Sequence, residues 1–363
     1  MSAVPLPAVL FGGPSPEHDV SILTGLPVVR ALGRAVAIYW APTGDFYEVD
    51  AAAEAADFVD GPPRKAPPVR LVAGEGFVGR KRPLDIAAVV NCCHGGPGED
   101  GTLQAAMDLA GVRYTGPTMA GAALGMDKLA FGNVVAAAGL PTLPRAMLTA
   151  EGEPPKFAGP YIVKPRFGGS SIGIEVVEDV ETARALVRSS PYLRNGAVVE
   201  PYLADAVDLN VGIRTWPEVQ LSAIEKPLRS TGGGILGFAD KYLAGAGGEG
   251  MASAPRELPA AVDDELEKQL REAARSVASL AGVRGVARLD FLLVGDHLVV
   301  NEINTVPGSL ARYLWVGEQQ VSFPQLLKDL LAEAEQRPTH RYSTAGADGT
   351  ALRSAGSIAS KLG

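Results

Sequence analysis

The 363-residue sequence has little cysteine, no excess of positive charge and no long hydrophobic run. Its only two cysteines, Cys92 and Cys93, are adjacent in an apolar stretch, which disfavours a disulfide framework or a metal cluster and indicates buried thiols in a reducing compartment. The net charge of −8 argues against a general nucleic-acid-binding protein, because neutralising phosphates requires a basic surface. Without a basic N-terminal region or an apolar run of about 18 residues, we expect a soluble cytoplasmic protein with no membrane partner.

Two common nucleotide-binding motifs are also missing. The pattern GxxxxGK[ST] is absent, so any nucleotide site is not a P-loop, and the turn "GGPSPEHDVS" lacks the GxGxxG spacing of a dinucleotide site. What the chain does have is 47% hydrophobic and 20% charged residues, a balance typical of globular proteins. Its length suits two or three domains of roughly 100–150 residues.

The first part of the chain, residues 7–116, alternates short apolar runs, Gly-rich turns and helical stretches. This order predicts an open parallel sheet. In such sheets ligands bind at the carboxyl ends of the strands. The Gly-rich turns after "AVLFGG" and "AAVVNCCHGG" are therefore expected to face one crevice.

The remainder predicts smaller α+β units. Residues 117–140 are expected to be helical, and three short strands, "YIVKP", "GIEVV" and "AVVEPYL", surround the helix "DVETARALVRSS". Strands over 208–226 precede the Gly-rich stretch "STGGGILGFADKYLAGAGGEG", whose composition indicates a functional or disordered loop. Further elements are expected as an amphipathic helix over 261–282, a hairpin turning at Gly295-Asp296, a helix over 324–336 and a disordered tail after 337.

The hairpin carries the strongest chemical signal. Glu302 and Asn304 are two residues apart on the returning strand and share a face, which Arg288 and Asp290 are expected to join. Oxygen ligands beside a cation suit a hard metal such as Mg²⁺ that also contacts substrate phosphates. A solvated face is the alternative, but buried unpaired charges are costly on an apolar strand.

A flexible loop, Phe167–Gly173 ("FGGSSIG"), follows a strand that carries Lys164. Glycines let the backbone approach a ligand, hydroxyls add donors and the lysine adds positive charge, a combination that suits phosphate. The same residues also fit an ordinary hairpin tip. Lys128 and Lys164 taken singly are weak signals, since most lysines are only surface charges.

Taken in order, "LFGGPSPEHDVSILTG", "HGGPGEDGTLQ", "GMDKLAFG", "IVKPRFGGSSIG", "VVEPYL", "DKYL" and "RLDF…NEINTVPG" resemble the D-alanine–D-alanine ligase family of ATP-grasp enzymes. The resemblance implies an α/β and α+β fold of three domains, with ATP clamped between two lobes. The expected boundaries are an N-terminal domain over 1–116, a central lobe over 117–206, a C-terminal lobe over 207–337 and a tail over 338–363. The implied reaction activates one amino acid as an acyl phosphate, from which the amine of a second displaces phosphate.

The resemblance also implies residue roles. ATP phosphates would be held by Lys128, Lys164 and Lys241, adenine by the hinge at Glu200 and Leu203, and the ribose by Asp208. Ligands of two Mg²⁺ ions, with Mn²⁺ as an alternative metal, would be Asp290, Glu302 and Asn304. Arg288 and the Gly308 backbone N–H would stabilise the oxyanion of the transition state.

At the amino-acid site, Glu17 resembles the carboxylate that anchors the ammonium of the first substrate. Ser170 and Tyr242 resemble its hydrogen-bonding partners, and Ser170 also belongs to the phosphate-binding loop. His94 stands where the family has a histidine near its substrates. The alternatives from the residues alone are a helix N-terminal acid for Glu17 and a structural histidine for His94. Glu99 is expected to order the crevice rather than take part in chemistry.

The sequence departs from the family pattern in several places. Asp208 lies one position further from Glu200 than expected, Gly168 replaces a commonly acidic residue, and "GFADKYL" replaces "YDYEAKY". More important, "SLARYLW" follows "NTVPG" at once, whereas the ligases have several more residues there. Ser309 and Leu310 are expected to bind the acceptor from a shortened loop, which could change acceptor specificity without changing the chemistry.

The leading hypothesis is therefore an ATP-dependent ligase that makes D-alanyl-D-alanine for peptidoglycan precursors, with small amino acids as substrates and a homodimer as the default assembly. One alternative is a ligase for another amino-acid pair in a natural-product or resistance pathway. The other is a nucleotide-binding protein without turnover, which the full set of charged residues at the expected site argues against.

Overall fold

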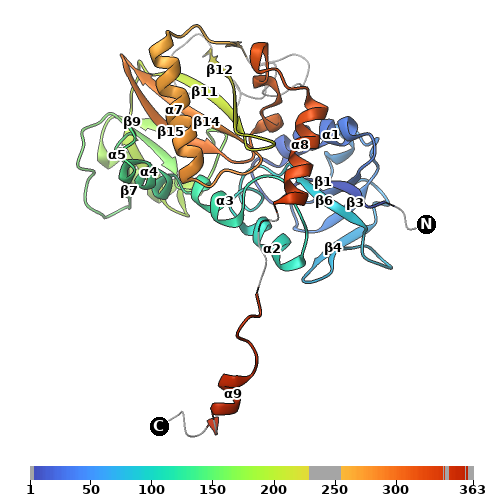
Figure 1. The fold of residues 1–363 in the computed structure, drawn as a ribbon. Helices are drawn as coiled ribbons and strands as arrows, with labels where there is room; N and C mark the ends of the chain where they lie inside the picture. The colour runs from blue at the N-terminus through green and yellow to red at the C-terminus, as the bar shows by residue number, and fades with distance from the viewer. Residues whose placement is uncertain (1–3, 229–254, 338, 340–342, 356, 359–363) are drawn as a thin grey trace.

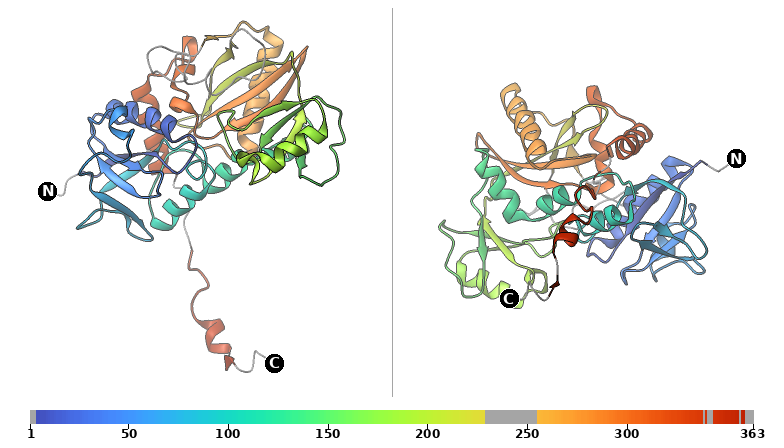
Figure 2. Two further views of the ribbon diagram at one scale, coloured as in Figure 1. Left: turned by 180° about the vertical axis from the view of Figure 1, so that it is seen from behind. Right: turned by 60° about the horizontal axis from the view of Figure 1, so that its bottom comes forward.

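The computed structural model describes residues 4–228, 255–337, 339, 343–355 and 357–358 of the chain. These residues form three sheets with helices around them (Figure 1). Figure 2 shows the N-terminal part, a small lobe formed by the middle of the chain and a larger lobe formed by its later part as three bodies. Lys241 and Tyr242 lie outside the described residues.

The N-terminal sheet has six strands in the order β5-β4-β3-β2-β1-β6. Strands β1 (Leu6–Gly12), β2 (Val36–Trp40) and β6 (Ile86–Asn91) are parallel, as the sequence predicts. The others, β3 (Phe46–Val49), β4 (Pro68–Val72) and β5 (Gly76–Val78), are antiparallel, so the sheet is mixed. The links β2–β3 and β4–β5 are too short for the crossover that a parallel pair needs.

Successive residues of β1 point to opposite faces of this sheet, and helices pack against both faces. Val9 and Phe11 pack with α1 (His18–Leu32) and α8 (Phe323–Gln336), whereas Ala8 and Leu10 pack with α2 (Thr102–Ala110). The Gly-rich turns follow directly after the carboxyl ends of β1 and β6. The adjacent Cys92 and Cys93 are fully buried free thiols, as expected.

The central part begins with two helices, α3 (Met119–Met126) and α4 (Lys128–Ala137), where the sequence predicts one helical stretch. The break lies at Asp127, whose carboxylate accepts hydrogen bonds from the first amides of α4 and pairs with Arg166 at 2.6 Å. A four-stranded antiparallel sheet follows in the order β7-β10-β8-β9. Its elements are β7 (Ala146–Leu148), β8 (Tyr161–Pro165), β9 (Glu175–Val177), α5 (Val180–Ser189), the 3-10 turn η2 (Pro191–Leu193) and β10 (Ala197–Pro201).

The larger lobe is a five-stranded antiparallel sheet in the order β13-β12-β11-β14-β15, with α7 (Asp264–Leu280) packed against it. Its strands are β11 (Val207–Arg214), β12 (Gln220–Pro227), β13 (Arg256–Glu257), β14 (Val286–Val294) and β15 (His297–Asn304). The predicted hairpin and its turn at Gly295-Asp296 are confirmed.

After β15 the chain returns to the N-terminal sheet. Leu310, Leu314 and Trp315, in and next to the short turn η4 (Gly308–Leu314), share one hydrophobic core with Phe11 and Tyr39. Two brief turns, η1 (Ala55–Phe58) and η5 (Gly317–Gln319), are also found among the described residues. In the tail, α9 (Thr350–Ser354) lies away from the body (Figure 1), a short helix where the sequence predicts disorder.

Candidate active site

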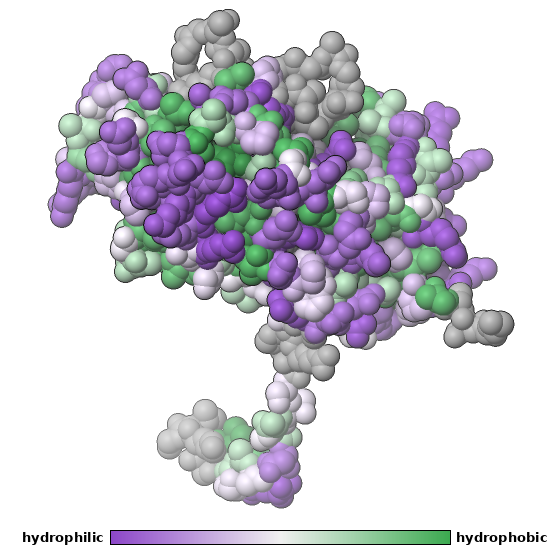
Figure 3. All heavy atoms as spheres, turned by 45° about the horizontal axis from the view of Figure 1, so that its top comes forward, coloured by the Kyte–Doolittle hydropathy of each residue, from purple (hydrophilic) through white to green (hydrophobic). Residues whose placement is uncertain are grey.

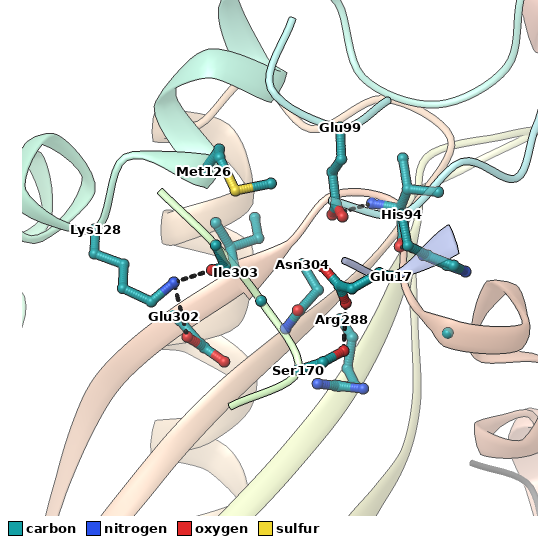
Figure 4. A pocket seen from close by; sticks show the side chains of 15 residues that line it. Glu17, His94, Glu99, Met126, Lys128, Ser170, Arg288, Glu302, Ile303 and Asn304 are labelled. Atoms are coloured by element: carbon teal, nitrogen blue, oxygen red, sulfur yellow. Dashed lines mark hydrogen bonds and ion pairs between the residues drawn. The ribbon is translucent and has the colours of Figure 1, made fainter. Parts of the chain in front are cut away.

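All three parts of the molecule contribute to a small cavity of about 40 Å³ (Figure 4). Eight residues predicted for the site line it: Glu17, His94, Lys128, Ser170, Arg288, Glu302, Asn304 and Gly308. They come from the turns after β1 and β6, the start of α4, the loop Phe167–Gly173 (the Gly-Ser loop), the β14–β15 hairpin and, for Gly308, the start of η4 (Gly308–Leu314). Residues separated by almost 300 positions in the sequence therefore meet at one place, which is what a multi-domain catalytic site requires.

The hairpin places its polar residues opposite each other. In the strand register Arg288 faces Asn304 and Asp290 faces Glu302. The Arg288 guanidinium donates two hydrogen bonds of 2.7 Å to the two carboxylate oxygens of Asp290, and the Asn304 amide donates a third at 3.0 Å. Burial alone would lower the pKa of Arg288, but the Asp290 carboxylate outweighs it and keeps the cation charged.

Lys128 connects this face to the Gly-Ser loop. As the first residue of α4 it is only 8% exposed, and its ammonium lies 3.8 Å from a carboxylate oxygen of Glu302. The same ammonium donates a hydrogen bond to the carbonyl of Gly168. A cation between a carboxylate and a flexible loop is suitably placed to meet an anionic group that enters the cavity.

The Gly-Ser loop closes onto the N-terminal domain. Ser170 donates a hydrogen bond to the Glu17 carboxylate, so this predicted partnership is present. Both Ser170 and Ser171 have positive φ, at 52° and 58°, a conformation that costs energy for residues other than glycine. A Cβ on Gly169 would lie 2.9 Å from a Glu17 oxygen, so the close approach depends on glycine at this position.

His94 and Glu99 tie the N-terminal domain to the loop after β15. The His94 ring contacts the Val306 carbonyl through Nδ1 at 2.8 Å and the Thr24 hydroxyl through Nε2 at 2.7 Å. The Glu99 carboxylate accepts hydrogen bonds from the backbone amides of Val306 at 2.8 Å and Gly95 at 3.2 Å. The expectation that Glu99 orders the crevice agrees with these contacts.

Burial shifts both titratable groups toward neutrality. Burial, followed by the charge of Glu17, raises the pKa of Glu99 to about 8. Burial also lowers the pKa of His94 to about 4. Both shifts favour the uncharged forms, although the two backbone N–H groups that donate to Glu99 oppose its shift because they favour the carboxylate.

Other predicted residues lie outside the cavity lining. Lys164 pairs at 2.7 Å with Glu200, whose second oxygen lies 2.7 Å from Arg145 Nε, so the three form a buried ionic cluster. Leu203 lies two residues after the end of β10 and Asp208 lies on β11, and neither lines the cavity. Their roles, and that of Glu200, stay predictions.

Ser309 and Leu310, which the sequence predicts to bind the acceptor, lie in two different environments. Ser309 lines a neighbouring cavity of about 300 Å³ together with Thr24, Arg312 and Phe323. The side chain of Leu310 is 3% exposed and packs in the N-terminal core. A contact between Leu310 and a substrate would therefore have to come from its backbone.

Two residues of the site are not predicted by the sequence. Arg145 donates to the carbonyl of Lys128 at 2.7 Å and to that of Asn301, linking α4 to β15. Thr24 is buried on α1 between His94 and Ser309. Arg145 lies in an irregular segment without any motif, whereas a polar residue on the buried face of an apolar helix was a usable signal for Thr24.

Comparison with known proteins places this chain in a family. The model of the D-ala D-ala ligase N-terminus matches residues 7–117, and that of the D-ala D-ala ligase C-terminus matches residues 134–332. The chain is 32% identical to a D-alanine–D-alanine ligase of Mycolicibacterium smegmatis, covering 92% of this chain and 96% of the relative. It is 29% identical to one of Campylobacter concisus, covering 85% and 88%.

Solved structures share the fold at lower identity. The D-alanine–D-alanine ligase from Coxiella burnetii has a TM-score of 0.76 at 22% identity, over 92% of this chain and 95% of that one. The VanG D-Ala:D-Ser ligase from Enterococcus faecalis has a TM-score of 0.73 at 23% identity, over 92% and 100%. With the cavity formed by Glu17, Ser170, Arg288 and the β14–β15 hairpin, these matches show that the chain belongs to the D-alanine–D-alanine ligase family of ATP-dependent ligases.

Proposed function

We propose that this chain joins two D-alanine molecules at the expense of ATP, to supply D-alanyl-D-alanine for peptidoglycan precursors. The observation that carries the proposal is that the hydrogen-bonded Glu17–Ser170 pair lines the same cavity as Arg288 and Asn304, which both donate hydrogen bonds to Asp290. The first group suits an amino acid's ammonium, and the second suits an activated carboxylate. Family membership supports the same chemistry.

The reaction proceeds in two balanced steps. A carboxylate oxygen of the first D-alanine attacks the γ-phosphorus of ATP, the bond to ADP breaks, and an acyl phosphate remains. The amine of the second D-alanine then attacks the acyl carbon, and phosphate leaves with the electrons of the broken C–O bond while the amine loses a proton. Arg288 and the Gly308 backbone N–H would stabilise the tetrahedral oxyanion that forms in the second step, after the amine adds to the acyl carbon and before phosphate leaves.

Glu17 would hold the ammonium of the first substrate. Its carboxylate accepts a hydrogen bond from Ser170 and lines the cavity, so it is fixed in position before the substrate arrives. Lys128 would neutralise the transferring phosphate, since its ammonium already lies at the loop and the hairpin. Lys164 would also neutralise the transferring phosphate, once its ammonium has exchanged the contact with Glu200 for one with the phosphate.

Asp290, Glu302 and Asn304 would hold Mg²⁺. Their donor chemistry fits, because two carboxylates and an amide oxygen are hard ligands, and Asp290 is oriented by Arg288 and Asn304. Within the described ranges no three His, Cys, Asp or Glu residues form a metal cluster, so nucleotide phosphates and water would complete the coordination. When bound, Mg²⁺ or Mn²⁺ would neutralise phosphate charge during transfer. We propose Glu200 and Leu203 for the adenine and Asp208 for the ribose. Lys241, which lies outside the described residues, is proposed as a further ligand of the phosphates.

A different acceptor is the second candidate, and a specific observation favours it. A cavity of about 300 Å³ lies beside Ser309, and its lining combines apolar side chains with the charged residues Arg30, Glu54 and Arg312. That space and charge suit an acceptor larger than alanine. The chemistry of both steps would be unchanged.

The experiment that tests the proposal measures phosphate release with Mg²⁺-ATP and single or paired D- and L-amino acids, with mass spectrometry of the products. Release with D-alanine alone and formation of the dipeptide are expected. Release only with another pair would show that the donor, the acceptor or both are amino acids other than D-alanine. No release with any pair would overturn the proposed function.

Assembly and compartment are further parts of the proposal. No helix in the described part of the chain is long and apolar enough to cross a membrane. Hydrophilic residues cover much of the face shown in Figure 3, with hydrophobic residues among them. We propose a cytoplasmic homodimer, supported by the ATP requirement and the family resemblance, which light scattering of the purified protein would test.

A further inference from the structure

The backbone of the loop after β15 is held by side chains of the N-terminal domain. Glu99 accepts a hydrogen bond from the Val306 amide, and His94 contacts the Val306 carbonyl. Thr24, on α1, accepts a hydrogen bond from the Ser309 amide at 3.2 Å. Gly308 lies between these anchors and lines the cavity, so the N-terminal domain determines where its backbone lies.

Two of these anchors are joined to each other. Thr24 Oγ1 lies 2.7 Å from His94 Nε2, so Val306 and Ser309 are bridged by the chain Val306–His94–Thr24–Ser309. Thr24 and His94 are each 3% exposed. Both side chains are thus buried, and loss of the Thr24 hydroxyl removes the partner that His94 Nε2 and the Ser309 N–H share.

The proton positions in the bridge follow from its ends. The Val306 carbonyl can only accept, so His94 Nδ1 carries the proton. Because burial keeps the imidazole neutral, with a pKa of about 4, Nε2 accepts the proton of the Thr24 hydroxyl. The Thr24 oxygen then accepts from the Ser309 N–H. Each donor in the bridge therefore has one acceptor, and all three hydrogen bonds are donated in the direction from Ser309 to Val306.

The loop needs such a restraint. Ser309, Leu310 and Ala311 have φ values of 53°, 50° and 52°, three consecutive left-handed residues without a glycine. Each costs free energy relative to an ordinary conformation, and such backbone persists only where the surroundings hold it. Thr24 contacts the first of the three, at the point where the strained run joins Gly308.

We propose that Thr24 is a positioning residue for the second half-reaction: its hydroxyl, oriented by His94, fixes the Ser309 amide and thereby aims the Gly308 N–H and the acceptor loop. This inference rests on the proposed ligase function. It assigns Thr24 no contact with a substrate. Its effect is on attack by the second amino acid rather than on binding of ATP.

The test compares Thr24→Val, which keeps the shape and removes the hydroxyl, with Thr24→Ser, which restores it. The Val variant is expected to lose about 10- to 100-fold in kcat/KM for the acceptor, with the KM for ATP within about twofold of wild type. The Ser variant should recover most of the loss. The matched control is Thr115→Val, since Thr115 is also 3% exposed and accepts one backbone hydrogen bond, from Asn91, away from the loop.

An unchanged acceptor kcat/KM in Thr24→Val, or an equal loss in Thr115→Val, would overturn the inference. Inactivity of the wild type with every amino acid would instead contradict the proposed function. A second measurement needs neither activity nor a folded variant: ¹⁵N spectra of histidine-labelled wild-type protein, which contains four histidines. A neutral His94 protonated at Nδ1 supports the bridge, and one protonated at Nε2 rules it out.

Discussion

Glu302 is the residue whose charge the proposed chemistry needs most directly. It lines the cavity, lies opposite Asp290 in the strand register and approaches the Lys128 ammonium at 3.8 Å. Changing the carboxylate to an amide preserves its size and removes a hard anionic ligand. A merely solvated strand face would tolerate this change.

We therefore predict that Glu302→Gln lowers kcat by at least about 100-fold while nucleotide affinity changes by less than about tenfold. Steady-state phosphate release and calorimetric titration with a non-hydrolysable ATP analogue measure the two quantities. The control is Glu175→Gln, an exposed glutamate on β9. Turnover equal to that of the control would contradict the proposed role of Glu302 as a metal ligand.

The protonation state of Glu99 affects the free energy of unfolding. Because burial raises its pKa from 4.5 to about 8 in the folded protein, the folded state retains a proton that the unfolded state loses between these pH values. The unfolded state is then favoured increasingly as pH rises from about 4.5 to about 8. His94 has the opposite effect at lower pH, since its depressed pKa favours the folded state as pH rises from about 4 to 6.5.

The prediction is that Glu99→Gln flattens the decline of unfolding free energy between pH 6.5 and 8, where His94 no longer contributes. The limiting slope for one proton is about 1.4 kcal/mol per pH unit. Urea unfolding of wild type and variant at several pH values measures it. Parallel pH curves would show that Glu99 is ionised in the folded protein.

At the scale of elements, the Gly-Ser loop depends on glycine to approach Glu17. Gly169 does not have positive φ, so alanine there is not strained by its backbone, but its Cβ would lie 2.9 Å and 3.2 Å from the two Glu17 oxygens. The carboxylate is the end of a flexible side chain and can move. Its displacement would disturb the site that we propose for the first substrate's ammonium.

Gly169→Ala should consequently raise the KM for the first D-alanine by roughly tenfold, with a melting temperature within a few degrees of wild type. Gly79→Ala is a suitable control, because the added Cβ would make only ordinary contacts, the nearest at 3.4 Å. Kinetics at varied D-alanine and thermal unfolding check both parts. Equal KM values in the two variants would contradict the proposed place of Glu17.

The sequence predicts some elements better than others, for physical reasons. The β14–β15 hairpin follows from alternation around a Gly-Asp turn, and α7 follows from its apolar periodicity. The antiparallel strands β3–β5 and the short strand β7 were missed, because their pairing depends on link lengths and tertiary contacts. The left-handed run at Ser309–Ala311 has no local signal, since it is held by distant side chains.

For the whole molecule, the division into domains cannot be read from local pattern alone. The segment from Val306 to Leu330 belongs to the expected C-terminal lobe, yet it shares a hydrophobic core with β1, β2 and α1. Burial against the N-terminal sheet is a long-range property that no local window contains. The motif residues of the site were predictable, whereas their connections through Thr24 and Arg145 were not.

That shared core has a consequence for the reaction. The N-terminal domain carries Glu17 for the proposed donor and also anchors the loop that carries Gly308. Movement of this domain relative to the larger lobe would alter both groups together. The proposed acyl transfer therefore depends on the assembled molecule, not on any one lobe.

The most direct test of the account follows an oxygen atom. D-Alanine labelled with ¹⁸O in its carboxylate would be the sole amino acid given to the enzyme with Mg²⁺-ATP, and the phosphate and peptide would be analysed by mass spectrometry. An acyl-phosphate route predicts D-alanyl-D-alanine and one carboxylate oxygen in each phosphate released. Dipeptide accompanied by unlabelled phosphate, or labelled D-alanine returned without any dipeptide, would contradict it.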